Sequence, residues 1–235
     1  MKSKTDPREE IYCMIKEEDH TGLLDESAVL HGHHCPGLAL GVKAASEAMK
    51  RLDKKSTGME DVIAFVETNN CLSDGVQFVT GCSFGNNSLV FKDLGKTAVT
   101  VAEREVGEGL RFVAKPDLHK RWSEDFPGYK DLFEKVVKKR DGSEEDKKKF
   151  SKLGEEVSHH LVKLPAEELF TIETIEVEFP DHAPIHESYI CEACGESVMS
   201  TRTVKKDGKT FCLPCGGEEF FELDGHGMKF RGDRK

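Results

Sequence analysis

Four cysteines near the end of the chain constrain its folding more than any other feature. They occur as Cys191-Glu-Ala-Cys194-Gly and Cys212-Leu-Pro-Cys215-Gly, two C-x2-C pairs separated by seventeen residues. This spacing is typical of a tetrahedral four-thiolate zinc site, which is closed and therefore structural. So short a module has little apolar surface to bury, and metal binding would supply most of its folding free energy. We therefore expect a structural zinc ion at these four cysteines.

The residues around the cysteines predict a small β module. Residues 198–204 and 209–211 flank Asp207-Gly208, which predicts a hairpin between the two cysteine pairs. The tail after Glu218 holds three phenylalanines beside charged residues. It predicts a helix followed by an extended end.

A proline-bracketed run, Pro180-Asp-His-Ala-Pro184, separates this finger from the rest of the 235-residue chain. Proline biases the residue before it to extended conformations, which is typical of a linker. We predict two domains, an α+β core over residues 1–184 and a zinc finger over residues 185–235.

The core domain shows helical and strand patterns in separate runs. An apolar face at helical spacing predicts a helix from Pro36 to Leu52, with proline in its first turn. Further helices are expected over 7–19, 22–31, 73–79 and most of 117–165, and strands over 62–67, 88–92, 97–103, 110–114 and 172–179. The pattern predicts the α+β class, with helices on a mainly antiparallel sheet.

The densest chemical stretch of the chain is His31-Gly-His33-His34-Cys35-Pro-Gly37. In an extended segment, residues 31, 33 and 35 share one side, which would bring two imidazoles and a thiol together. Cys35 also precedes the expected helix, and a helix N-terminus stabilises a thiolate. Cys71 and Cys82 each follow the end of an expected element and could join the group, with simple burial as the equally open alternative. The candidate ligands of a second metal ion are therefore His31, His33, Cys35, Cys71 and Cys82.

Other polar residues near these motifs receive simpler predictions. Asp74 and Gln77 are three residues apart on an expected helix and share a face. His34 is expected to be structural and Cys13 to be a core residue. The pair His159-His160 lies in a charged helical region and is expected on the surface, with a ligand role as the lesser alternative.

Three blocks of the chain, in order, resemble the FmdE family, which is named after a component of formylmethanofuran dehydrogenase. The stretch from His31 to Gly41 resembles its signature H-G-H-x-C-P-G-x-x-x-G, which opens a helix. The blocks 67–77 and 80–85 are similar to its E-x-x-x-C-x-x-D-A-x-Q and T-G-C patterns, and 92–98 to its D-x-G-K turn. The resemblance covers residues 20–115, and some members also carry a C-terminal zinc finger of treble-clef type.

This resemblance implies an α+β core with an appended finger, assembled as a homodimer around a functional cleft. Carried over by position, the cleft residues are His33, Cys35, Cys71, Asp74, Gln77, Cys82 and Lys96. The implied catalytic residues are Cys35, Asp74 and Lys96, and the implied ligand-binding residue is Gln77. Gly75 stands where the family commonly has alanine, and the charged stretch 116–165 receives no role.

Composition restricts the partners and the location. The 34 Lys and Arg against 44 Asp and Glu give a formal net charge of −10, which argues against nucleic-acid binding through phosphate neutralisation. Apolar runs are too short to cross a bilayer, and the polar first ten residues lack the pattern of a secretory signal. We therefore expect a cytoplasmic protein with reduced cysteines.

The leading hypothesis is a metal-binding protein of the FmdE type, with one structural zinc ion and a core cleft for a second metal ion or a small ligand. The family is named for a molybdenum or tungsten complex that reduces carbon dioxide to formylmethanofuran, so the resemblance implies a link to methanogenesis and a larger oxidoreductase complex. The sequence itself assigns no reaction. The alternative is a non-enzymatic zinc-finger interaction module with a partner-binding or regulatory role.

Overall fold

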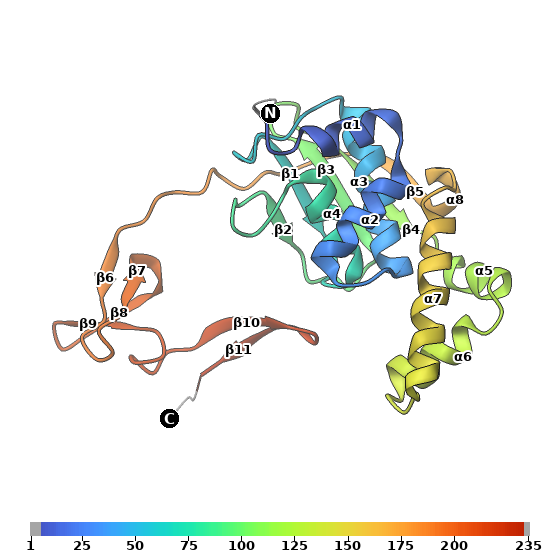
Figure 1. Ribbon diagram of the computed structural model, residues 1–235. Helices are drawn as coiled ribbons and strands as arrows, with labels where there is room; N and C mark the ends of the chain where they lie inside the picture. The colour runs from blue at the N-terminus through green and yellow to red at the C-terminus, as the bar shows by residue number, and fades with distance from the viewer. Residues whose placement is uncertain (1–5, 233–235) are drawn as a thin grey trace, which may run out of the picture. The chain divides into compact units, whose positions relative to one another are not determined.

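The computed structural model describes residues 6–232, which divide into two units (Figure 1). The first unit ends at Pro180 and the second begins at Asp181. The boundary thus follows the first proline of the proline-bracketed run, a few residues before the boundary predicted at 184. The first five residues of the polar N-terminal segment and the last three of the chain lie outside the described part.

A five-stranded sheet forms the frame of the first unit. Its strands are β1 (Val62–Val66), β2 (Leu89–Phe91), β3 (Ala98–Glu103), β4 (Glu108–Ala114) and β5 (Phe170–Glu176). Their order is β2-β1-β3-β4-β5, in which β1 and β2 run parallel and the other neighbours antiparallel. Antiparallel pairing dominates the sheet, and most helices precede β1 or lie together between β4 and β5, so the predicted α+β class is confirmed.

The apolar sequence of β1 explains its place inside the sheet. All five residues of this Val-Ile-Ala-Phe-Val strand are buried. Val62 and Val66 face the main hydrophobic core with the helices, whereas Ile63 and Phe65 form a smaller cluster on the opposite face. A strand that is covered on both faces reads as a continuous apolar run, as this one does.

Eight α-helices lie within the described part of this unit. They are α1 (Glu9–Glu17), α2 (His20–His31), α3 (Pro36–Leu52), α4 (Cys71–Thr80), α5 (Leu118–Asp125), α6 (Tyr129–Phe133), α7 (Glu144–Leu161) and α8 (Ala166–Leu169). A π-helical turn (Glu134–Lys138) continues α6, and residues 139–143 separate it from α7. Cys13, expected in the core, is exposed because it lies on the outer face of α1.

Helix α3 is the central helix of the core and has the bounds that its sequence predicted. Pro36 occupies its first turn, and Cys35 is its N-cap, with Sγ accepting a hydrogen bond from the amide of Leu38 at 3.4 Å. Val42 and Met49 on its apolar face are almost completely buried. Each such side chain contributes about 1.5–3 kcal/mol through removal from water.

Helices α3 and α4 cross in direct backbone contact. A Cβ atom at Gly41 would lie 2.1 Å from the carbonyl oxygen of Leu72, and one at Gly75 would lie 2.7 Å from that of Leu38. At the start of α3, a Cβ at Gly37 would lie 3.0 Å from the Cβ of Cys71. Gly75, where the family commonly has alanine, therefore has no room for a side chain here.

Helix α4 begins two residues before its predicted start. Its N-cap is Asn70, whose side-chain oxygen accepts a hydrogen bond from the amide of Leu72 at 3.0 Å. Ser73, where the predicted helix began, is buried, and its hydroxyl donates to the carbonyl of Thr68. Asparagine and serine are similarly strong N-caps, but the Ser73 hydroxyl is bonded to Thr68 and Asn70 holds the cap position. Cys71 is therefore the first residue of α4 and not a residue of the preceding loop.

The second unit consists of short hairpins. Its strands are β6 (Ser188–Ile190), β7 (Ser197–Met199), β8 (Thr203–Lys206), β9 (Lys209–Cys212), β10 (Phe220–Asp224) and β11 (Gly227–Arg231), with a 3-10 turn at Ser200–Arg202. The hairpin around Asp207-Gly208 is β8–β9, while β7 pairs with β6. The helix predicted after Glu218 is wrong, because the apolar residues alternate with polar ones around a turn at Gly225 and form the β10–β11 hairpin.

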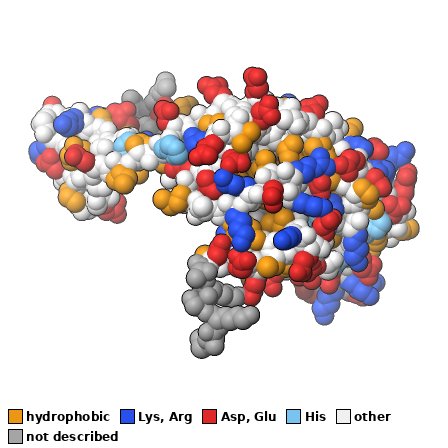
Figure 2. All heavy atoms as spheres, turned by 90° about the horizontal axis from the view of Figure 1, so that it is seen from above, with side chains coloured by type: hydrophobic (Ala, Val, Ile, Leu, Met, Phe, Trp, Pro, Cys, Tyr) orange, Lys and Arg blue, Asp and Glu red, His pale blue; other side chains and the backbone are white. Residues whose placement is uncertain are grey.

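Charges of both signs cover the surface. Figure 2 shows acidic side chains interspersed with Lys and Arg on the face it displays. Many of them pair, as Arg51 does with Glu47 and Glu167. Among residues 6–232, no helix combines the length and the apolar character needed to cross a membrane.

The α3–α4 crossing gives a first prediction. We expect Gly41→Ala to lower the free energy of unfolding by about 1–3 kcal/mol, because the new methyl group forces the two helices apart. In a helix without this contact, replacing glycine by alanine would raise the stability by about 1 kcal/mol, so a loss of stability would itself indicate the close crossing. Urea denaturation followed by circular dichroism measures the effect. The control is Gly85→Ala, whose Cβ would meet only the Ser83 hydroxyl at 3.9 Å; equal effects of the two would contradict the close crossing.

Candidate thiol–imidazole and zinc sites

The end of α2 and the start of α3 bring two imidazoles and a thiol together. Gly32 ends α2 with φ at 89°, which reverses the chain so that His33 returns beside His31. The two rings lie 4.5 Å apart, and ligating atoms of His31, His33 and Cys35 lie within 4.8 Å of one another. His31, His33 and Cys35 were expected to lie together, and they do. The expected reason, an extended segment with alternating side chains, is wrong, because His31 ends helix α2 and the turn at Gly32 brings His33 back beside it.

Cys71 joins this group through the helix crossing. It is the first residue of α4, packed against Gly37 of α3, so the N-termini of both helices point at the thiol pair. A hydrogen bond from Cys35 and the nearby His31 lower the pKa of Cys71 to about 6. Sharing a proton with Cys71, together with burial, raises the pKa of Cys35 well above its usual range. The pair therefore carries one thiolate, on Cys71, near neutral pH.

Asp74 orients His31 toward the thiols. The Nδ1–H of His31 donates to Asp74 Oδ2 at 2.7 Å, and its Nε2 lies 3.5 Å from Cys35 Sγ. Gln77, one turn further along α4, donates to the other oxygen of Asp74 at 3.3 Å. A carboxylate that holds one ring nitrogen while the other faces a ligand position is the usual arrangement around metal-bound histidine. Asp74 and Gln77, expected at the reacting centre, thus lie behind His31.

His33 completes the imidazole pair on the solvent side. Desolvation by the surrounding side chains, together with His31 and His34, lowers its pKa. A neutral imidazole at neutral pH can ligate a metal ion, because its lone pair is free of a proton.

Two predicted members of the cleft lie elsewhere. Cys82 follows the far end of α4, about 15 Å along the helix from Cys71 at 1.5 Å per residue. It is fully buried, donates to the carbonyl oxygen of Val62 at 3.4 Å, and has its pKa raised to about 11 by burial. Lys96 is exposed and lies near Glu67, after strand β1.

Sequence reasoning also missed a buried ion pair between Glu67, which follows β1, and Arg111 of β4. Glu67 is 6% exposed, and both its oxygens accept hydrogen bonds from Arg111, at 2.7 and 2.9 Å. Arg111, followed by Lys96 and Lys92, lowers the pKa of Glu67. Glu67 belongs to the family motif at 67–77, but the sequence around Arg111 of β4 does not indicate that Arg111 is its partner.

Tyr129 of α6 was also missed. It is 4% exposed, and burial together with the nearby Cys35 and Cys71 raises its pKa well above the usual range. Its phenol therefore stays neutral near the thiol pair. The residue comes from the charged stretch 116–165, to which the sequence assigned no role.

His34 and His159 meet away from the thiols. Nε2 of His34 and Nε2 of His159 lie 3.0 and 2.9 Å from the same oxygen of Asp25. His34 was expected to have a structural role, and its contact with Asp25 fits that role. His159 was expected on the surface, but its side chain is partly buried and lies against Asp25.

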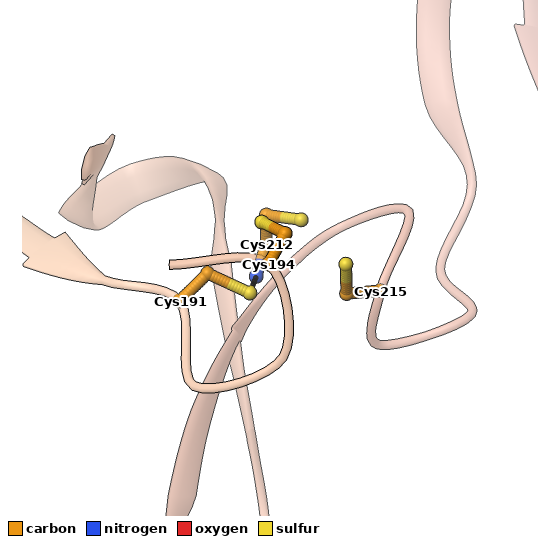
Figure 3. Close-up of side chains that lie close together, drawn as sticks. All are labelled: Cys191, Cys194, Cys212 and Cys215. Atoms are coloured by element: carbon orange, nitrogen blue, oxygen red, sulfur yellow. Dashed lines mark hydrogen bonds between the residues drawn. The ribbon is translucent and has the colours of Figure 1, made fainter. Parts of the chain in front are cut away.

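The four cysteines of the second unit form a separate cluster. Figure 3 shows their sulfur atoms converging, and all four lie within 4.8 Å of one another. Tetrahedral zinc thiolates stand about 3.8 Å apart, so only small movements are needed to enclose an ion. The Cys212 amide donates to Cys191 Sγ at 3.3 Å, and the amides of Cys194 and Cys212 lower the pKa of Cys191 to about 6. This donor set fits a structural zinc ion.

The fold and these clusters define a metal-binding α+β protein with a separate C4 zinc finger. The chain belongs to the FmdE family, since the family model described as "FmdE, Molybdenum formylmethanofuran dehydrogenase operon" matches residues 30–171. A second model, the prokaryotic dksA/traR C4-type zinc finger, matches residues 187–219. The resemblance noted in the sequence is thereby confirmed.

Two known proteins are similar over most of this chain. A protein from Archaeoglobus fulgidus, described as a probable S-adenosyl-L-methionine-binding protein, is 42% identical over 221 residues. That match covers 92% of this chain but only 58% of the relative's length. The crystal structure of an FmdE-like protein of the tungsten formylmethanofuran dehydrogenase type, from Syntrophus aciditrophicus, shares the fold, with a TM-score of 0.55 and 22% identity over 84% of this chain and 92% of its own.

The shared proton of the thiol pair predicts a pH dependence. In metal-free protein, the lowered pKa makes Cys71 a thiolate above about pH 6. We expect alkylation of Cys71 by iodoacetamide to reach half its maximal rate near that pH. Cys35→Ala removes the hydrogen-bond donor and should move the midpoint upward. Peptide mapping by mass spectrometry separates Cys71 from the other thiols, with buried Cys82 as the slow internal reference; an unmoved midpoint would refute the pairing.

The finger gives a prediction about metal removal. Cys212→Ser should release the zinc ion and unfold the hairpins of the second unit, because the metal supplies most of their stability. The first unit should keep its cooperative unfolding. Zinc analysis and amide NMR dispersion measure the two effects, and Cys13→Ser, an exposed thiol outside both clusters, serves as the control. Retained zinc in the Cys212 variant would argue against a four-cysteine site.

Proposed function

We propose that the thiol–imidazole cluster of the core binds a second, soft divalent metal ion, and that this centre is the functional site of the protein. The observation that carries the proposal is the convergence of His31, His33 and Cys35 ligating atoms within 4.8 Å. Cys71 adds a thiolate beside them. Imidazole and thiolate ligands favour zinc and other late transition metals over magnesium or calcium.

The surroundings of the cluster support a metal centre. Asp74 fixes the ring of His31 so that Nε2 faces Cys35, and the low pKa of Cys71 provides a ligand that needs no deprotonation at neutral pH. His33 lies on the exposed side, where a substrate or solvent molecule has access. When bound, the metal would supply Lewis acidity at this position. His31, His33, Cys35 and Cys71 would hold the ion, and the number of thiolates among them would set the net charge of the site.

The small-molecule ligand of the site is also part of the proposal. The Archaeoglobus relative is described as binding S-adenosyl-L-methionine, and 42% identity over nearly all of this chain makes that molecule the first candidate to test. The chain spans only 58% of the relative's length, so a direct binding measurement decides whether the matched region holds the ligand.

A second candidate function rests on the finger. Phe221 and Phe230 of the β10–β11 hairpin stack with ring centroids 4.2 Å apart, and both are more than half exposed. An exposed aromatic pair is typical of a protein-binding surface. It supports the interaction-module alternative, in which the zinc finger recognises a partner. The homodimer, the larger oxidoreductase complex, the link to methanogenesis and the cytoplasmic location stay predictions.

Metal analysis of the whole chain tests the proposal. We expect protein purified without oxygen or chelators to hold one equivalent of metal more than its Cys35→Ser variant, because the variant loses a core ligand but keeps the finger. Cys82→Ala is the matched control, since that thiol lies at the other end of α4. Plasma mass spectrometry gives the content and calorimetry gives the affinity of each protein for S-adenosyl-L-methionine.

Two outcomes would overturn parts of this proposal. Identical metal content in the wild type and the Cys35 variant would exclude a stable core centre and leave the interaction module as the better account. Unchanged binding of S-adenosyl-L-methionine in the Cys35 variant would place that ligand elsewhere on the chain.

A further inference from the structure

We propose a third metal site, free of sulfur, formed by Asp25, His34 and His159. It would take a divalent transition-metal ion such as Zn²⁺ or Co²⁺. Its three residues come from α2, from the loop before α3, and from α7. The site does not depend on the proposed function of the thiol–imidazole cluster.

The ligand atoms already converge on one point. Nε2 of His34 and Nε2 of His159 lie 3.0 and 2.9 Å from the same oxygen of Asp25. The two rings lie 5.2 Å apart and are tilted by 35°, so both can direct a lone pair at a common centre. Two imidazoles and one carboxylate are a frequent protein ligand set for zinc and iron, which leaves further positions for solvent.

The backbone of α7 is what brings His159 into range. Gly154 faces the carbonyl oxygen of His34, which a Cβ there would approach to 3.3 Å. Helix α7 therefore lies against the loop that carries His34, and His159 stands just over one turn further along. The side chains of both histidines are about three-quarters buried.

Both ring nitrogens of His159 face oxygen atoms. Nδ1 lies 3.1 Å from the carbonyl oxygen of Glu155, and Nε2 lies 2.9 Å from Asp25. A doubly protonated ring can donate to both oxygens without a metal ion. With an ion on Nε2, Nδ1–H keeps its bond to the Glu155 carbonyl, and a backbone carbonyl is one of the usual partners of a metal-bound histidine.

The location of the site gives it a structural consequence. The charged segment that contains α7 also contains α6 with Tyr129, which lies near Cys35 and Cys71. A metal ion bound by Asp25, His34 and His159 cross-links this segment to α2. It therefore stabilises the arrangement that covers the thiols, by the free energy of binding to the folded state.

Cobalt titration of the whole, zinc-finger-loaded protein tests the site. Co²⁺ bound to thiolates gives strong sulfur-to-metal charge-transfer absorption, whereas a His/Asp site adds visible bands without it. We expect wild-type protein to bind one more Co²⁺ than His159→Asn and Asp25→Asn, with equal charge-transfer intensity in all three. The affinity for this ion should fall by about tenfold or more in each variant.

The control is His160→Asn, which removes an exposed imidazole next in sequence that packs on Phe126. The His160 variant should bind Co²⁺ like the wild type. Zn²⁺ should raise the melting temperature of the wild type and of the His160 variant, but not that of His159→Asn. The proposal is overturned if the His159 and Asp25 variants bind as much Co²⁺ as the wild type, which would mean a hydrogen-bonded ion pair only. It is equally overturned if they lose charge-transfer absorption, because the lost ion would then belong to the cysteines. Failure of the core centre appears instead as a Cys35→Ser variant without effect.

Discussion

The close crossing of α3 and α4 is the constraint on which the core depends. Gly41 and Gly75 let the two backbones touch, and Gly37 gives Cys71 the space to lie beside the first turn of α3. This contact directs two helix N-termini at one pair of thiols. The amide groups there carry partial positive charge, which favours the thiolate that the pair holds.

Neighbouring groups shift the pKa values of the two thiols in opposite directions. Cys71 receives a hydrogen bond and lies near His31, so its pKa falls, while burial and the shared proton raise that of Cys35. Asp74 holds His31 by its far nitrogen. Thiols whose pKa values are shifted by specific neighbours, beside an imidazole held by a carboxylate, are common at functional sites.

The two units are stabilised by different physics. The first unit buries an extensive apolar core, in which Phe112 and Phe170 meet edge to face at 5.8 Å. The second unit has short hairpins and few buried side chains among the residues described, so its order depends on the ion that its cysteines enclose. Loss of metal should therefore affect the finger first.

Local spacing in the sequence was enough to predict the helix 36–52, the α+β class, the four-cysteine finger and the family. It also placed His31, His33 and Cys35 together, although through the wrong local geometry. Packing of the folded core was needed to show that Cys71 joins them and that Cys82 does not, since Cys71 begins the ten-residue helix α4 and Cys82 follows its end. The partners of Tyr129, Arg111 and His159 were beyond sequence reasoning for the same cause. Each residue reaches its partner across a contact between helices or strands, and the packing of the whole core sets such contacts without leaving a periodic pattern in the residues nearby.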